Sequence, residues 1–237
     1  MSNDIYLYDN SHVLKNLLNI TDEDELDLAE AEISRANMML LYEKGFDDFS
    51  ADGICEIHKE LFGDVYEWAG QYRKINIIKR EEILAGTSVW YSDVIQIDKD
   101  LNRVWKEINK VDWGNISKDE FVFNISHLFP RLWQVHPFRE GNTRTIIMLL
   151  TFFIEHYGYY FDQMLMSESA GYVRNSLVWA SLGENSEYEY FENILRDAIC
   201  TEPIEYSDES DMKTEKAPKY EKYKTEDYVP SKHEYTE

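Results

Sequence analysis

A nine-residue run, IIMLLTFFI (residues 146–154), constrains the fold of this 237-residue chain more than any other feature. If the run is helical, apolar side chains cover nearly its whole circumference, and such a helix is stable only when other elements surround it. The run is far shorter than the roughly 20 residues of a membrane-spanning helix. It therefore predicts a buried central helix over residues 142–157, which the rest of the chain has to cover.

Most of residues 1–200 carry the apolar spacing of amphipathic helices. Apolar positions recur every three or four residues in four further segments, 26–41, 54–62, 94–108 and 121–133, and two shorter helices are expected within 174–199. Only residues 74–92 alternate as strands do, with Gly86 near a turn, so one β-hairpin is expected there. The predicted fold class is mostly α, a helical bundle with a single hairpin.

Composition divides the chain after residue 200. Residues 201–237 hold 11 acidic residues, 6 lysines and 3 of the 5 prolines, but few large aliphatic side chains. Such a segment cannot bury enough apolar surface to order itself, so we expect a flexible acidic tail after a domain over residues 1–200. The five tyrosines of the tail leave open that a partner orders it.

The acidic balance also restricts the classes of partner. A formal net charge of −22 repels nucleic-acid phosphates and anionic lipids, so neither a nucleic acid nor a membrane surface is an expected partner. The first residues, MSNDIYLYDN, lack the basic and apolar regions of a secretory signal. A cytoplasmic protein is therefore expected, and delivery to another cell is left open.

The segment VHPFREGNTRT (135–145) lies between two helical patterns and has residues suited to phosphate chemistry. Gly141 permits a tight turn, and a helix beginning near Asn142 offers N–H groups and the positive end of its dipole to an anion. Arg144 adds a forked cation, Glu140 a ligand for Mg²⁺, and His136 a general base. Together these groups predict phosphoryl or nucleotidyl transfer.

The sequence HPFREGNTR (136–144) resembles the signature of Fic proteins, H-P-F-x-[DE]-G-N-G-R-x-x-R. Three more segments are similar to bacterial Fic proteins of the cell-filamentation type: YLYDNSHVLKNLLNI (6–20), LDLAEAEISR (26–35) and HKELFGDVYEWAGQYRKINI (58–77). The resemblance implies a Fic-type helical bundle. It also implies transfer of AMP from ATP to a Ser, Thr or Tyr hydroxyl of a target protein, with Mg²⁺ as cofactor.

The resemblance further implies roles for individual residues. His136 would deprotonate the target hydroxyl, Phe138 would anchor the loop in the core, and Glu140 would ligate Mg²⁺. Gly141, Asn142, Thr143 and Arg144 would hold the nucleotide. The hairpin over residues 74–92 would be a flap that binds a target segment by strand addition, with a purely structural hairpin as the alternative. Its target-binding residues would be Ile83, Leu84, Ala85, Gly86, Thr87, Ser88 and Val89.

Two positions depart from the signature. Thr143 stands where the second glycine is expected, and Ile147 stands where the last arginine is expected. In the family, that arginine contacts the γ-phosphate and pairs with an inhibitory glutamate, and Doc-type relatives with lysine at the place of Thr143 transfer a phosphoryl group. Phosphoryl or other nucleotide transfer, and a catalytically impaired Fic-fold binding protein, therefore remain alternatives to AMP transfer.

The inhibitory helix of the family, [ST]-x-x-x-E-[GN], is incomplete throughout the sequence. Glu184-Asn185 has the right ending, but Ala180 replaces the hydroxyl residue. Three pairs have the spacing without the ending: Thr21/Glu25, Thr151/Glu155 and Thr201/Glu205. The sequence therefore predicts no self-inhibition of this form. A small antitoxin that carries the helix, regulating a toxin or effector, is the candidate partner, and a homodimer is left open.

Overall fold

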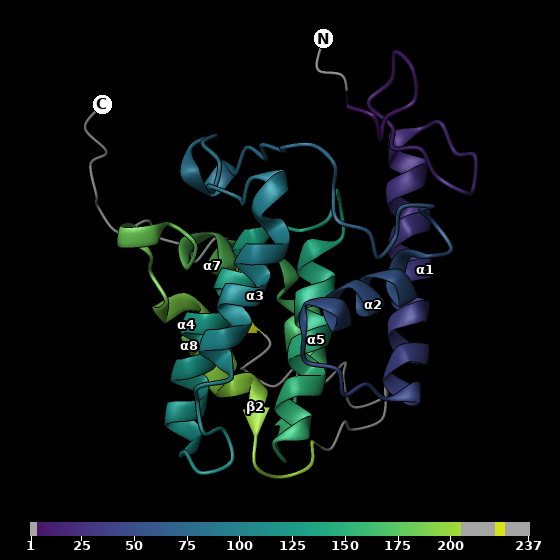
Figure 1. Cartoon of the computed structure of the whole chain (residues 1–237). Helices are drawn as coiled ribbons and strands as arrows, with labels where there is room; N and C mark the ends of the chain where they lie inside the picture. Colours follow the sequence, from purple (N-terminus) through teal and green to yellow (C-terminus); the bar gives the residue numbers. More distant parts are fainter. Residues whose placement is uncertain (1–3, 205–220, 226–237) are drawn as a thin grey trace. The chain divides into compact units, whose positions relative to one another are not determined.

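The computed structural model describes residues 4–204 and 221–225 (Figure 1). The chain forms two compact units, each assembled from three stretches of sequence. Of the described residues, the first unit comprises 4–77, 91–110 and 135–153, and the second comprises 78–90, 111–134, 154–204 and 221–225. Of the predicted functional segments, the loop 136–144 belongs wholly to the first unit.

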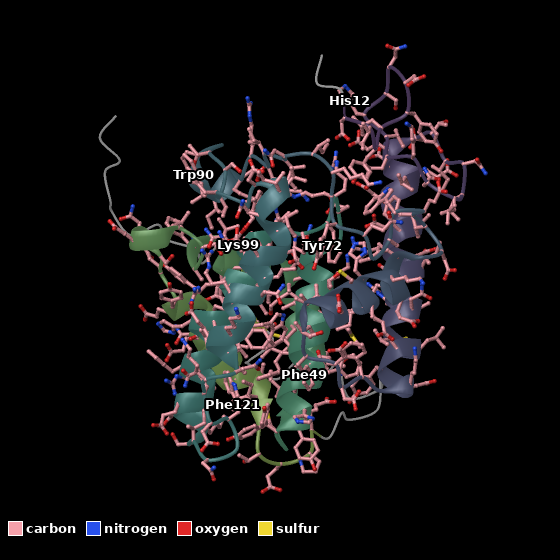
Figure 2. All side chains as sticks on the ribbon, viewed as in Figure 1. His12, Phe49, Tyr72, Trp90, Lys99 and Phe121 are labelled. Atoms are coloured by element: carbon pink, nitrogen blue, oxygen red, sulfur yellow. The ribbon has the colours of Figure 1, made fainter. Side chains whose placement is uncertain are left out.

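The first unit is helical. It contains α1 (Glu23–Lys44), α2 (Ala51–Phe62), a 3₁₀ turn η2 (Val94–Gln96), α3 (Ile97–Ile108) and most of α5 (Asn142–His156). Asp22 and Ser50 accept hydrogen bonds at the starts of α1 and α2, as N-cap residues do. Figure 1 shows α2 crossing between α1 and α5. Phe49, labelled in Figure 2, packs edge-on against Phe153 of α5 with ring centroids 5.2 Å apart.

The second unit holds the remaining elements. These are η1 (Glu82–Leu84), α4 (Lys118–Val135, apart from its last residue), β1 (Tyr160–Phe161), α6 (Gln163–Glu168), α7 (Ala170–Trp179), η3 (Gly183–Asn185), α8 (Glu189–Ala198) and β2 (Ile199–Cys200). The strands β1 and β2 pair antiparallel, with Tyr160 opposite Cys200 and Phe161 opposite Ile199. This short sheet joins the start of the α6–α7–α8 segment to its end.

The prediction of a mostly α fold is confirmed, and so are the helices predicted from apolar spacing. In the run 146–154, every residue except the half-buried Ile147 is buried, as the sequence requires of a helix that is apolar on all sides. Within residues 4–204 and 221–225, no helix combines the length and the apolar character that crossing a membrane would require.

The β-hairpin predicted over residues 74–92 is not formed. The backbone closes at one point, where the N–H of Glu81 donates to the carbonyl of Thr87 at 2.9 Å, and the tip folds into η1. Ala85 and Gly86 both have positive φ and form the tight turn at the tip, but the residues on either side of this turn form no strand ladder. A side-chain ion pair fixes this segment, because both carboxylate oxygens of Glu81 accept from Nη2 of Arg174 in α7, at 2.8 and 2.9 Å.

Residues 221–225, part of the segment expected to be a flexible tail, contact α7 and α8 in the structure. Tyr223 is only 5% exposed, and its hydroxyl oxygen lies 2.8 Å from the carbonyl of Asn193 and 2.7 Å from the carboxylate of Asp197 in α8, the two acceptors that share its one proton. Its ring also packs on Tyr172 of α7. One aromatic side chain thus docks a segment whose composition predicts no order; the remaining predicted tail residues, 205–220 and 226–237, lie outside the described residues.

Candidate active site

The loop 136–141 connects α4 to α5 and has two residues with positive φ, His136 at 51° and Gly141 at 80°. Gly141 is the position that needs glycine most. A Cβ atom there would lie 2.4 Å from Cε2 of Phe62, which is inside any tolerated contact distance. The backbone of Gly141 therefore lies directly on the Phe62 ring, and this contact places the start of α5.

The side chain of Asn142 closes the loop from within. Its Oδ1 accepts a hydrogen bond from the N–H of Phe138, and its Nδ2 donates to the carbonyl of the same residue, both at 2.9 Å. The side chain of Asn142 is used within the loop, so the group that Asn142 can offer to an anion is its backbone N–H. Helical geometry gives the first N–H groups of α5 no acceptor inside the helix, and this end of the dipole favours negative charge.

Phe138 is fully buried and stacks on the ring of His58 with centroids 3.8 Å apart. Nδ1 of His58 accepts from the N–H of Gly70 at 2.8 Å, so Nε2 carries the proton and donates to the carbonyl of Glu140 at 3.0 Å. Burial lowers the pKa of His58 to about 3, which keeps the ring neutral. His58 thus supports the loop from α2. No motif around His58 in the sequence indicates this role.

His136, the candidate base, is completely buried. The ring of Tyr91 stacks on it with centroids 4.0 Å apart and an interplanar angle of 26°. Its backbone carbonyl accepts a hydrogen bond from Nε of Arg73 at 2.9 Å. Ring and backbone are therefore both held, and the ring edge, where the two nitrogens lie, is the part through which the residue can exchange a proton.

Arg144 lies in the first turn of α5 and is bound by α1. Its Nη1 donates to Oγ of Ser34 at 2.7 Å, its Nη2 forms an ion pair with Glu30, and its guanidinium lies 4.8 Å from the Phe62 ring centroid. The side chain is 34% exposed, whereas that of Glu30 is 8% exposed and also accepts a hydrogen bond from Tyr66. Burial, reinforced by Glu30, raises the pKa of Tyr66, so the phenol stays a donor.

Glu30 and Ser34 are functional candidates that the sequence reasoning missed. A signal for them exists, because they are polar positions on the face of α1 that otherwise buries Leu26 and Leu41. Two polar residues four apart on a buried helix face require a partner. The partner turns out to be Arg144, which lies more than a hundred residues away in sequence.

Glu140 has the character expected of a Mg²⁺ ligand. It is half-buried, and its Oε1 accepts a hydrogen bond from the N–H of Gly141 at 3.2 Å. Asp27 lies within its electrostatic range: burial raises the pKa of Asp27, and Glu23 and Glu140 raise it further. The described residues contain no cluster of three or more His, Cys, Asp or Glu side chains that would hold a resident metal. One or two carboxylates fit Mg²⁺ that arrives with nucleotide phosphates.

Thr143 and Ile147, where the sequence departs from the Fic signature, are half-buried residues of α5. Thr143 lies in the first turn beside Asn142. Ile147 follows Arg144 by three residues and Thr143 by four, so the side chains of Thr143 and Ile147 lie on the same side of the helix. Ile147 is uncharged, so Arg144 is the one arginine of the Fic signature that this sequence keeps at the start of α5.

The predicted flap residues Ile83 to Val89 belong to the second unit, whereas the loop 136–144 belongs to the first. Gly86 and Thr87 are exposed, and Val89 is buried. Trp90, labelled in Figure 2, is 90% exposed while its carbonyl accepts a hydrogen bond from Gln134. The ends of this segment are anchored, and its tip is open to solvent.

Comparison with known proteins identifies the family. The model of the Fic/DOC family matches residues 48–154, a range that contains α2, the loop and most of α5. The probable protein adenylyltransferase y4lH of Sinorhizobium fredii is 34% identical over 158 residues, which are 66% of this chain and 78% of that protein. The chain belongs to the Fic/DOC family.

Two further similarities extend over more of this Fic protein. Protein adenylyltransferase VbhT of Bartonella schoenbuchensis is 30% identical over 200 residues, covering 81% of this chain but 41% of VbhT, so the chain spans less than half of that relative. Among solved structures, the N-terminal Fic domain of a VirB-translocated Bep effector from Bartonella quintana superposes with a TM-score of 0.69 at 25% identity. That match covers 83% of this chain and 92% of the other.

Proposed function

We infer that this Fic protein is a protein adenylyltransferase that transfers AMP from ATP to a Ser, Thr or Tyr hydroxyl of a target protein. The observation that carries the proposal is the loop 136–144, which puts a buried histidine six residues before a helix whose first turn bears an arginine. The family match includes this whole loop, and the relatives y4lH and VbhT carry the name protein adenylyltransferase.

In the proposed reaction, His136 accepts the proton of the target hydroxyl through its ring edge. The hydroxyl oxygen forms a bond to the α-phosphorus as the bond between the α-phosphorus and the bridging oxygen breaks, and pyrophosphate leaves. The N–H groups of Gly141, Asn142 and Thr143 and the guanidinium of Arg144 hold phosphate oxygens at the start of α5. Phe138, packed on His58, keeps the loop in place during these steps.

We propose that Glu140 holds Mg²⁺ when nucleotide is bound, with Asp27 as the neighbouring carboxylate. Mg²⁺ in such sites neutralises phosphate charge and orients the phosphates. We also propose that a separate small protein supplies the inhibitory helix, because no complete motif occurs in this sequence. Light scattering of the purified chain, alone and with a candidate antitoxin, tests both that proposal and a homodimer.

Intact-mass spectrometry after incubation with ATP and Mg²⁺ tests the proposed function. Self-modification by one adenylyl group supports it, and addition of one phosphoryl group would instead favour the Doc-type alternative that Thr143 and Ile147 keep open. An unchanged mass, together with calorimetric binding of ATP, would favour a binding protein. His136→Ala is the control, because loss of a general base costs about 10²- to 10⁴-fold in rate without removing a contact to the nucleotide.

A further inference from the structure

Arg73 is a buried arginine that gathers backbone carbonyls from three segments of the first unit. It is 2% exposed, and its Nε donates to the carbonyl of His136 at 2.9 Å. Nη1 donates to the carbonyl of Ile75 at 2.7 Å, and Nη2 donates to the carbonyl of Ser92. The backbone N–H of Arg73 also donates to the carbonyl of Pro137 at 2.8 Å.

Two of these segments are the ends of the predicted flap. The chain leaves the first unit at Ile77 and returns to it at Tyr91, so the carbonyls of Ile75 and Ser92 flank the excursion over residues 78–90. Asn76 adds a second tie between the same ends: its Nδ2 donates to Asp93 at 3.0 Å, and its Oδ1 accepts from the N–H of Val94 at 2.8 Å. These side chains replace the absent strand ladder.

The third segment is the candidate catalytic loop. His136 has φ of 51°, a left-handed conformation that is strained for a non-glycine residue and persists only when its surroundings hold it. Arg73 binds the carbonyl of His136 and the carbonyl of the next residue, while Tyr91, one residue before Ser92, stacks on the imidazole. The same guanidinium therefore fixes the strained base and the flap ends.

Only a guanidinium can make this arrangement. Its N–H donors lie in a rigid plane and point in different directions, so one side chain can satisfy three carbonyls that converge from different segments. Lysine carries the same charge, but on a single ammonium group at the end of a flexible chain, so it lacks the rigid planar set of N–H donors. Burial lowers the pKa of Arg73 from its ordinary value, and Asp93 acts in the opposite direction.

We propose that Arg73 is a positioning residue for adenylyl transfer. Its hydrogen bonds keep the backbone of His136 and of both ends of the segment 78–90 in fixed positions. This inference rests on the proposed function. It assigns to Arg73 the orientation of the base, while Arg73 itself touches neither nucleotide nor target.

The test is Arg73→Lys, with Arg35→Lys as the matched control, because Arg35 is an exposed arginine of α1. Initial rates of label incorporation from α-labelled ATP into proteins of a bacterial lysate give a maximal rate and a KM for ATP. Arg73→Lys should lower the maximal rate by about 10²-fold, the usual cost of misplacing a reacting group by about 1 Å. The KM for ATP should stay within about twofold, and the control should match wild type.

Hydrogen–deuterium exchange separates failure of this inference from failure of the proposed function. Arg73→Lys should speed exchange in residues 73–77, 91–94 and 136–138 and leave α8 unchanged, whether or not the wild-type protein labels any target. A folded Arg73→Lys protein with wild-type rates and wild-type exchange in these segments overturns the inference. If wild type transfers nothing, the proposed function fails and exchange alone decides.

A second variant covers the case in which Arg73→Lys does not fold. Asn76→Ala removes the other tie between the flap ends at an exposed position, so the fold should survive. It should lower the maximal rate with an unchanged KM for ATP and loosen residues 73–77 and 91–94. Unchanged rates and unchanged exchange in this variant would equally overturn the inference.

Discussion

Replacing Gly141 by alanine measures how closely the backbone of the active-site loop must lie on the core. Two costs add. Holding a non-glycine residue at φ of 80° costs about 1–2 kcal/mol, and forcing a methyl group to 2.4 Å from the Phe62 ring is overpacking, which costs about 1–3 kcal/mol. We therefore expect the free energy of unfolding to fall by about 2–5 kcal/mol. At about 2–4 °C per kcal/mol, Tm should fall by about 4–20 °C.

Gly158→Ala is the matched control. Gly158 has φ of 84°, nearly the same backbone conformation, but a Cβ atom there would meet no atom within 4 Å. This variant should show the backbone cost alone, so its Tm should fall by about 2–8 °C. The difference between the two variants isolates the contact with Phe62.

Thermal melts by circular dichroism, followed by urea titration, give both values. The double variant Gly141→Ala/Phe62→Leu should recover part of the loss, because the shorter side chain leaves room for the methyl group, and a double-mutant cycle should give a favourable coupling of about 1 kcal/mol or more. Equal destabilisation in Gly141→Ala and Gly158→Ala, with no coupling to Phe62, would refute the reasoning.

Three further predictions concern residues around the loop and the docked tail. The pKa of His58 is about 3 in the folded protein and 6.5 ordinarily, so between these pH values the unfolded state binds one proton more than the folded state. The free energy of unfolding should therefore fall by about 1.4 kcal/mol for each pH unit below 6.5. Urea titrations should show a smaller loss in His58→Gln. Glu30→Gln should leave Arg144 less firmly oriented and raise the dissociation constant of a non-hydrolysable ATP analogue several-fold by calorimetry, whereas tighter binding would mean that Glu30 competes with phosphate. Tyr223→Phe removes the hydroxyl that is hydrogen-bonded to α8 and should lower the free energy of unfolding by about 1–2 kcal/mol, whereas an unchanged melt would show that this hydroxyl does not stabilise the fold.

The helices were predictable because their apolar spacing is a local property of the sequence. The run 146–154 could be stable only inside a core, and the structure buries it there. The residues His136, Glu140 and Arg144 were also predictable as candidates, because nine consecutive residues bring a base, a carboxylate and a cation to one helix start. Spacing within one element carries this information without any knowledge of tertiary contacts.

The features that could not be predicted depend on contacts between distant segments. Glu30 and Arg144 pair only because the fold brings α1 and the start of α5 within side-chain reach, and nothing local to either residue specifies the pair. The alternation of apolar and polar residues over 74–92 agrees with the burial of Val89, but a strand also needs a partner strand that pairs with it in register. Here buried side chains, Arg73 and Glu81, hold that segment instead, and composition likewise could not show that Tyr223 docks on α8.

The chemistry of the loop 136–144 is tested most directly by a paired-label transfer assay. Wild type and His136→Ala are each incubated with Mg²⁺, a bacterial lysate and ATP labelled either at the α- or at the γ-phosphate, and calorimetry measures binding of a non-hydrolysable analogue to both proteins. Wild type should transfer the α-label and not the γ-label, and His136→Ala should lose labelling while it binds the analogue nearly as well. Transfer of the γ-label by wild type, or full α-labelling by His136→Ala, would contradict the account.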